Sequence, residues 1–286
     1  METVLSSYSR KVVIGPDLPT VLIGERINPT GKRKMAEALR AGALELVRKE
    51  AASQAQADAD VVDINVGTAG VDEINLLPQA VQVAMDTIDL PLCLDSANPL
   101  ALEAALKVYR GKALVNSVSG KEESLAKVLP LVKQYGAAVV GLVQDDEGIP
   151  AEPERRLDIA HKIVERAEAI GIPHEDIVID CLALAIGAEP KSGLLVIETI
   201  RRVKEELGVN LVLGASNISF GMPEREVLNS ALVAIAIAAG ATCLIADVAK
   251  IRPIVLAVDL ILGRDRYGRR YIEGYRQRQR AKQGST

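Results

Sequence analysis

Aspartate and asparagine residues recur directly after short apolar segments of this 286-residue chain, at Asp63 and Asn65, at Asp95, at Asn116 and at Asp180. Paired carboxylate oxygens can accept the N–H donors of a guanidine-like heterocycle edge, and several carboxylates together can hold Mg²⁺. The pattern therefore predicts a polar, hydrogen-bonding cup that binds either such a heterocycle or a divalent cation.

Other apolar segments also end in polar residues, namely Glu25-Arg26-Ile27-Asn28, Gln144-Asp145-Asp146, Ser216-Asn217 and Asp247. Any one of these side chains could simply be the N-cap of the next helix. Capping does not explain a whole set, because clustered like charges repel unless a ligand or mutual hydrogen bonds satisfy them. We expect Glu25 and Arg26 to form a buried ion pair. Asn28 and Asn65 either contact the ligand or shape their loops.

The segments that position these residues alternate between two types, short apolar runs typical of strands and longer runs in which apolar residues have helical spacing. Short β-branched runs predict strands at 21–24, 61–65, 92–95, 113–116, 138–142, 177–180, 211–214 and 243–247. Helical spacing predicts helices at 34–56, 76–87, 99–109, 122–135, 155–170, 194–207 and 225–239. Continuously apolar strands indicate a parallel sheet covered on both faces. Eight strands alternating with helices predict a single (β/α)₈ TIM barrel, whose active site lies at the carboxyl ends of the strands.

The predicted barrel occupies residues 21–263. Residues 1–20 form an N-terminal extension in which Val12-Val-Ile-Gly15 could belong to a hairpin at the barrel floor. Residues 264–286 hold seven arginines and a lysine and predict a basic, solvated terminal helix or tail.

Composition excludes several classes of function. The chain has 49% hydrophobic residues, a formal charge of −4, no Trp and a single Phe, which disfavours nucleic-acid binding. No apolar run reaches the roughly 20 residues of a membrane span, so we expect a cytoplasmic protein. Two histidines and three dispersed cysteines give no zinc motif and no Ser-His-Asp triad, and we expect no tightly bound metal.

Six motifs resemble the pterin-binding family, and they occur in the order that the family has. They are Ile23-Gly-Glu-Arg-Ile-Asn28, Asp63-Ile-Asn-Val-Gly67, Cys93-Leu-Asp-Ser96, Val115-Asn-Ser117, Ile179-Asp180 and Gly214-Ala-Ser-Asn-Ile-Ser219. Within that family the chain is similar to the methyltetrahydrofolate:corrinoid/iron–sulfur protein methyltransferases and to the folate domain of cobalamin-dependent methionine synthase.

The resemblance implies an enzyme that transfers the methyl group of 5-methyltetrahydrofolate to the cob(I)amide of a separate corrinoid protein, and it implies a homodimer. Asp95, Asn116 and Asp180 would anchor the pterin ring, and Asn217 would hydrogen-bond N5. Further site positions carried over or inferred are Asp63, Asn65, Asn28, Gly214, Ser216 and Arg225. Phe220 stands where some relatives have Gln.

Two alternatives stay open at this point. Dihydropteroate synthase shares the barrel and the pterin anchors, although its strand-7 lysine and Ser-Phe motif are replaced here by Ser216-Asn217. A non-catalytic folate-binding barrel would bind methyltetrahydrofolate without transferring the methyl group. For the methyltransferase, the cobalt would come on a partner protein, since neither His161 nor His174 lies in an Asp-x-His-x-x-Gly setting.

Overall fold

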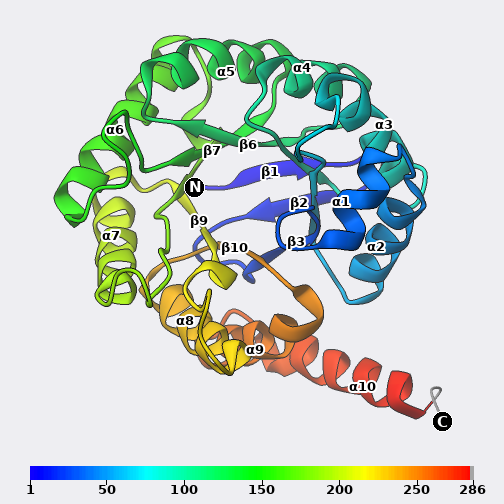
Figure 1. Cartoon of the computed structure of the whole chain (residues 1–286). Coiled ribbons are helices and arrows are strands. Elements are labelled where there is room, and N and C mark those ends of the chain that lie inside the picture. Colours follow the sequence, from blue (N-terminus) through cyan, green and yellow to red (C-terminus); the bar gives the residue numbers. More distant parts are fainter. Residues whose placement is uncertain (284–286) are drawn as a thin grey trace.

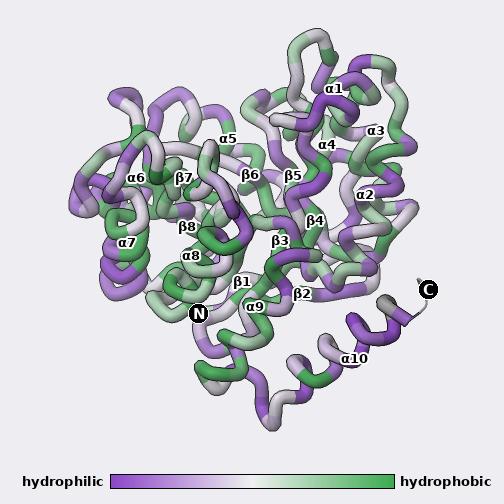
Figure 2. The backbone as a smooth tube through the Cα atoms, turned by 60° about the horizontal axis from the view of Figure 1, so that its bottom comes forward, coloured by the Kyte–Doolittle hydropathy of each residue, from purple (hydrophilic) through white to green (hydrophobic). Residues whose placement is uncertain are grey.

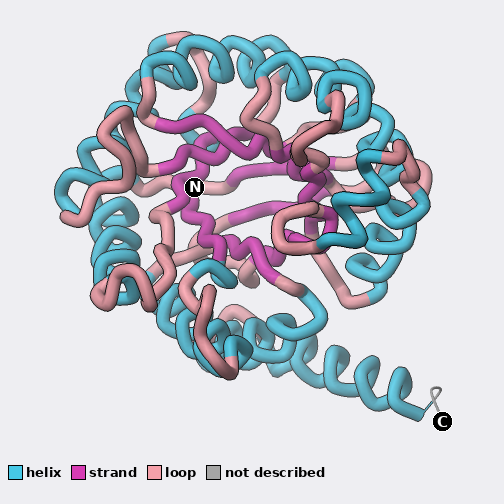
Figure 3. The backbone as a smooth tube through the Cα atoms, viewed as in Figure 1, coloured by secondary structure: helices cyan, strands magenta, loops and turns pink. Residues whose placement is uncertain are grey.

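The computed structural model describes residues 1–283, and within them eight parallel strands close into a barrel surrounded by helices (Figures 1 and 3). The barrel strands are β3 (Val21–Ile27), β4 (Val61–Asn65), β5 (Leu92–Asp95), β6 (Leu114–Ser119), β7 (Ala138–Leu142), β8 (Ile177–Asp180), β9 (Asn210–Gly214) and β10 (Cys243–Ala246). They are hydrogen-bonded in chain order, and β10 closes on β3. The predicted TIM barrel is confirmed.

Helices follow the strands around the outside of the barrel. They are α1 (Arg33–Arg40), α2 (Glu45–Gln56), α3 (Glu73–Met85), α4 (Pro99–Val108), α5 (Glu122–Tyr135), α6 (Pro153–Ala169), α7 (Ser192–Leu207), α8 (Arg225–Ala239), α9 (Val248–Ile261) and α10 (Arg269–Gln283). The single helix predicted at 34–56 is wrong, because α1 ends where Gly42 takes a left-handed φ of +67° and α2 starts anew. The last strand ends at Ala246, one residue earlier than predicted.

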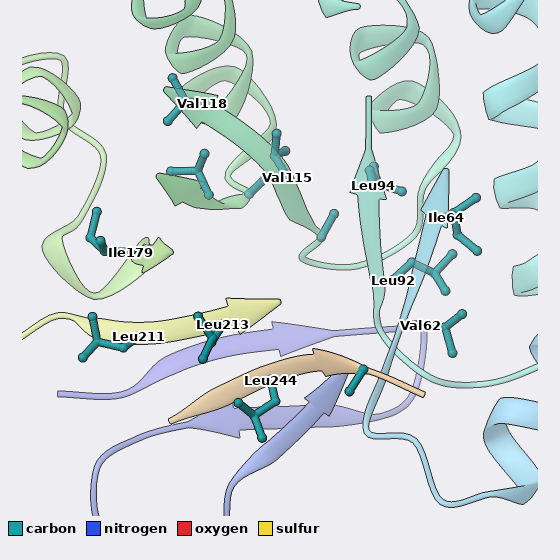
Figure 4. Close-up of a cluster of buried hydrophobic side chains, with 14 of the residues drawn as sticks. Val62, Ile64, Leu92, Leu94, Val115, Val118, Ile179, Leu211, Leu213 and Leu244 are labelled. Carbon is teal, nitrogen blue, oxygen red and sulfur yellow. The ribbon is translucent and has the colours of Figure 1, made fainter. Parts of the chain in front are cut away.

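Side chains that point out of the barrel form the larger apolar core. Val62, Leu94, Val115 and Leu213 alternate with inward residues on their strands and pack against the helices (Figure 4). Inward residues form a separate apolar layer, made of Val21, Ile23, Val61, Cys93, Leu114, Ala138, Val140, Val178, Val212 and Cys243. The barrel is therefore filled with side chains at this level and has no pore.

An antiparallel hairpin of β1 (Thr3–Ser6) and β2 (Lys11–Ile14) packs against this inner layer. Its Leu5 and Ile14 are fully buried there, and the amide of Asn210 at the start of β9 donates to the carbonyl of Ile14. Strand starts lie at the amino end of a parallel barrel. The hairpin thus closes that end, and the opposite end, where the strands finish, is the mouth.

The C-terminal helix α10 contacts α9 and then extends away from the barrel (Figure 1). Its residues are mostly hydrophilic, as Figure 2 shows. Across residues 1–283 we find no helix with the length and apolar character needed to cross a membrane.

Candidate active site at the barrel mouth

Strand alternation turns a second layer of inward side chains toward the mouth. Each residue of this second layer follows a residue of the inner apolar layer by two or four positions in the sequence. The second layer consists of Glu25, Asp63, Asn65, Asp95, Asn116, Asp180, Gly214 and Asp247. Because successive side chains point to opposite faces of a strand, residues two apart face the same way. The strands that fill the barrel with apolar groups therefore end in a ring of carboxylates and amides.

Neighbouring strands place Asn65, Asp95 and Asn116 side by side, since Asn65 is in register with Asp95 and Asp95 with Asn116. The Asn65 side chain donates a hydrogen bond to Asp95. Below them Asp63, only 2% exposed, accepts bonds from the Cys93 thiol and from Asn116 Nδ2 at 3.3 Å. The Asn116 amide nitrogen is thus held by the protein, which leaves its carbonyl oxygen as an acceptor for a ligand.

Burial makes these carboxyl groups easier to protonate than usual. Desolvation, with the Asp95 carboxylate as a second cause, raises the pKa of Asp63 well above its ordinary range. Burial likewise raises the pKa of Asp95 to about 6. Near neutral pH, Asp95 can therefore present a carboxylate to a ligand, while Asp63 below it resists ionisation more strongly than usual.

Asp180 lies across the barrel at the end of β8 and is 7% exposed. Its Oδ1 accepts the backbone N–H of Leu182 at 2.8 Å, and burial raises its pKa to about 6. Fully buried Arg156 donates from Nη1 to the carbonyls of Cys181 and Leu182, which fixes the loop after β8. Arg156 belongs to a helix that reads as ordinarily amphipathic, and no signal in the sequence distinguishes it.

The short segment after β9 carries Gly214, Ser216 and Asn217. A Cβ at Gly214 would lie 2.9 Å from Asn217 Nδ2, so the Asn217 side chain folds back over the glycine. Within the described chain this amide has no hydrogen-bond partner. Arg225 fixes the segment by donating to the Ser216 carbonyl at 2.9 Å and to Ser219 Oγ at 3.0 Å. Asn217 therefore presents an unpaired amide on a braced loop at the mouth.

The predicted ion pair between Glu25 and Arg26 is wrong, because the two side chains alternate along β3 and point to opposite sides. Glu25 accepts the Ser216 hydroxyl at 2.6 Å, and burial raises its pKa. Arg26 pairs instead with Glu50 at 3.2 Å and with Asp247 at 3.5 Å.

The capping interpretation does not account for the ring. In α1 to α9 the N-cap side chains that bond the helix are those of Asp72 and Asn98, and neither belongs to the ring. Asp247 occupies the N-cap position of α9 but makes no side-chain cap bond. Asn65 and Asn28 do shape their loops, since they accept the N–H groups of Gly67 and Thr30.

Three cavities open at the mouth. One of about 370 Å³ contains Asp95, Asn116 and Gln144, and a second of about 530 Å³ contains Glu25, Ser216, Arg225 and Asp247. A third of about 500 Å³ lies between the loops after β3 and β4. The exposed Phe220 ring lies 5.8 Å from the Arg225 guanidinium. Among residues 1–283, no three His, Cys, Asp or Glu side chains come together as a group that could hold a metal ion.

A barrel of this kind, with a buried ring of carboxylates and amides at its mouth, has the architecture of an enzyme that binds a polar ring rich in N–H groups. The model of the pterin binding enzyme family matches residues 24–247, and the chain belongs to this family. The predicted family and the prediction of an enzyme are both confirmed.

Curated relatives cover nearly the whole chain. It is 30% identical over 267 residues to the methylcorrinoid:tetrahydrofolate methyltransferase of Eubacterium limosum, covering 90% of this chain and 96% of that protein. It is 31% identical over 286 residues to the methionine synthase of Mycobacterium tuberculosis, of which it spans 24%. Solved structures share the fold: dihydropteroate synthase of Yersinia pestis, bound to a pterine-sulfa conjugate, has a TM-score of 0.71 at 15% identity, covering 91% of this chain and 99% of that one.

Proposed function

We propose that this protein transfers a methyl group between N5 of 5-methyltetrahydrofolate and the corrinoid of a separate protein, in the cytoplasm. The observation that carries the proposal is the unpaired Asn217 amide, held over Gly214 beside a ring of pterin-type hydrogen-bonding groups. Similarity to a methylcorrinoid:tetrahydrofolate methyltransferase over 90% of the chain supports it.

The pterin ring would be held by its pyrimidine half. Asp95 and Asp180 supply carboxylates on opposite sides of the mouth, and a carboxylate can accept two parallel N–H bonds from a guanidine-like edge. Asn116 adds a carbonyl acceptor, because its nitrogen is already bonded to Asp63. Gly214, Ser216 and Arg225 line or brace the neighbouring segment. Asn65 supports Asp95 from the side, and Asp63 supports Asn116 from below.

Methyl transfer from N5 is difficult because an amine is a poor leaving group. A hydrogen bond that strengthens as negative character develops on N5 lowers the barrier, since it stabilises the transition state more than the ground state. Asn217 would donate that bond. Its amide cannot act as a strong acid, so the proton on N5 would come from solvent through the polar mouth.

The methyl acceptor or donor would be a corrinoid that a partner protein brings to the open mouth. As acceptor, its reduced cobalt would be the nucleophile; in the reverse direction N5 would attack the methyl group and the cobalt would leave. Mouth residues of this chain would orient the folate toward that approach and hold the reacting atoms together. The same geometry serves either direction, because a transition state is shared by the forward and reverse reactions.

Methyl transfer to free reduced cobalamin tests the proposal. Purified protein with methyltetrahydrofolate should form methylcobalamin, and Asn217→Ala should lower the rate about 10²–10³-fold while folate affinity is largely kept, since the lost donor acts mainly in the transition state. Glu205→Ala, at an exposed position on α7 outside the mouth cavities, is the control and should leave the rate close to wild type.

Two results would contradict the proposal. Folate binding with no methyl transfer would identify a non-catalytic barrel. Condensation of a pterin diphosphate with an aromatic amine, without methyl transfer, would identify a dihydropteroate synthase activity.

We also propose that the protein is a homodimer that pairs through α8. The outer face of this helix carries exposed Val227, Ala231, Ile235 and Ala238, and from Val227 to Ala239 the helix has no charged residue. An apolar helix face of this kind on the surface marks an interaction site. Sedimentation equilibrium should give a dimer for the wild type and a monomer for Ile235→Glu; a dimeric variant would exclude this surface.

A further inference from the structure

One cavity at the mouth is lined by cations and by no carboxylate. It lies between the loops that follow β3 and β4 and is also lined by residues of α1. Figure 2 shows α1 at the end of the molecule opposite the hairpin. Its lining, here called the cationic cavity, consists of Pro29, Thr30, Gly31, Lys32, Arg33, Ala36, Arg40, Gly67 and Thr68. None of the pterin-anchoring residues lies in it, so the proposed reaction leaves this cavity without a role.

The cations of the cavity keep donors for a ligand. Lys32 Nζ donates to the carbonyls of Glu25 and Arg26, at 3.0 and 3.1 Å. Arg40 donates to the carbonyl of Ala69 at 2.9 Å. The carbonyl partner of Arg40 is neutral, so its charge is not cancelled, and a guanidinium has five N–H donors to share. The Lys32 ammonium also interacts with the nearby carboxylates of Glu25, Glu50 and Asp247. Arg33 does pair with Glu37, but its side chain is 91% exposed, where an ion pair contributes little.

The cationic cavity adjoins the pterin anchors. Asn65, which bonds Asp95, also accepts the N–H of Gly67 at 2.8 Å, and Gly67 lines the cavity. Lys32 reaches the backbone at the end of β3, directly beside Glu25 of the inward ring. The cationic cavity therefore lies next to the position that a ligand bound at Asp95 would occupy.

The proposed pterin orientation, on which this inference rests, directs the rest of the folate toward that sector. The pyrimidine anchors lie on β5, β6 and β8, and Asn217 at N5 follows β9. Carbon 6, bonded to N5, carries the aminobenzoyl-glutamate tail, so the tail leaves over β10 and β3. The first cavity it meets holds four carboxylates, Glu25, Glu224, Glu226 and Asp247, against two cations. That cavity repels an anion, whereas the cationic cavity next to it attracts one.

We propose that the cationic cavity binds the carboxylates of the folate's glutamate tail and that the protein consequently prefers polyglutamylated folates. A glutamate tail carries one added carboxylate for every added residue, and carboxylates pair with guanidinium and ammonium groups. The first turn of α1 also favours an anion at this position. Thr30 and Thr68 supply hydroxyl groups for the remaining carboxylate oxygens.

Binding of three ligands tests the inference: a tetrahydropterin without a tail, methyltetrahydrofolate with one glutamate, and the same folate with three. Wild type should bind the triglutamate roughly three- to tenfold more tightly than the monoglutamate, as expected for exposed charge-assisted contacts. Arg33→Gln/Arg40→Gln should abolish that difference and leave the affinity for the tailless pterin unchanged. Arg48→Gln on α2, outside the cavity, should behave as wild type in all three measurements.

The outcomes separate this inference from the proposed function. If wild type binds neither the tailless pterin nor either folate, the proposed function fails. If all three bind and the double variant keeps the wild-type order of affinities, the inference is overturned while the function stands. A tailless pterin that binds more tightly when inorganic phosphate is added would show a phosphate site and would also overturn it. Thermal melting of the double variant checks that the loops after β3 and β4 still fold.

Discussion

The two ends of the barrel are built from the same strands but from opposite chemistry. At the amino end, Leu5 and Ile14 of the hairpin belong to the same buried apolar cluster as Val61 and Cys93. At the carboxyl end, the inward positions of the same strands hold Asp63 and Asp95. A shift of two residues along one strand therefore separates a layer that stabilises the fold from a layer that costs stability.

The cost is visible in the direction of the carboxyl pKa values. Burial raises the pKa of Glu25, Asp63, Asp95 and Asp180, which means that each folded carboxyl group resists ionisation. A layer selected only for stability would contain apolar side chains at these positions. The polar ring is retained against its electrostatic cost, as expected of a site whose carboxylates are neutralised by a bound ligand.

The largest expected effect lies at the amino end. Leu5→Ala removes a fully buried side chain from the inner apolar layer and should lower the free energy of unfolding by about 2–5 kcal/mol. Urea unfolding measures this loss. Leu100→Ala, at a side chain that is 60% exposed on α4, is the control and should change little. Folate affinity of the folded variant should match wild type; a large fall would mean that the two ends are not independent.

At the mouth, Asp180→Asn should have effects opposite to those of Leu5→Ala: it should lower pterin affinity and raise stability. The amide keeps an oxygen for the Leu182 N–H but loses the charge, so pterin affinity should fall roughly tenfold to a hundredfold. At pH 7.5 the free energy of unfolding should rise by on the order of 1–2 kcal/mol, because a buried charge is removed. Calorimetry of folate binding and urea unfolding measure the two effects, and a variant that loses both affinity and stability would contradict the comparison.

Measuring the stability of the wild type and of Asp180→Asn at several pH values makes this test more specific. The folded pKa of Asp180 is about 6, above the ordinary value of 3.8, so the folded state holds the proton more tightly. The contribution of this group to stability is therefore largest in acid and declines as pH rises through about 6. The stability advantage of Asp180→Asn should shrink as pH falls from 7.5 to 4. Wild-type pterin affinity should rise between pH 5 and 7, as Asp95 and Asp180 ionise.

Periodicity made most of the fold predictable. Strand runs such as 61–65 and 138–142 coincide with the structure, because a strand buried on both faces is apolar throughout and stops abruptly at polar residues. The break between α1 and α2 was missed because Ala41-Gly-Ala43 is compatible with a helix until Gly42 adopts a positive φ. Local sequence does not fix that choice, which depends on how α2 packs against the barrel.

The candidate site was predictable as a set of positions but not as a set of contacts. Alternation places Asp63 and Asp95 inside the barrel, yet only the structure shows that Asp63 lies beneath Asn116 and binds its amide. Lys32 and Arg156 were missed, because a cation in a loop or on a helix looks solvated in sequence. The run Gly31-Lys-Arg-Lys34, directly after a strand end, was the one available signal for the cationic cavity.

The smallest expected effect tests whether Gly214 is needed to position the Asn217 amide at the mouth. Gly214→Ala would put a methyl group 2.9 Å from Asn217 Nδ2, and the movable partner is the end of the Asn217 side chain. The fold should therefore tolerate the change with a loss of no more than about 1 kcal/mol, while the displaced amide loses its alignment with N5. We expect methyl transfer to slow about tenfold with folate affinity nearly unchanged.

Single-turnover kinetics with reduced cobalamin measure this effect, and combining Gly214→Ala with Asn217→Ala shows its origin. If the glycine acts by placing the amide, the double variant should be no slower than Asn217→Ala alone, because the group being displaced is already absent. Additive losses would mean that Gly214 acts on the substrate directly, through close approach of its backbone to the pterin. Within residues 1–283, the Asn217 side chain is the only group that a Cβ at this position would meet within 4 Å, so we expect the non-additive result.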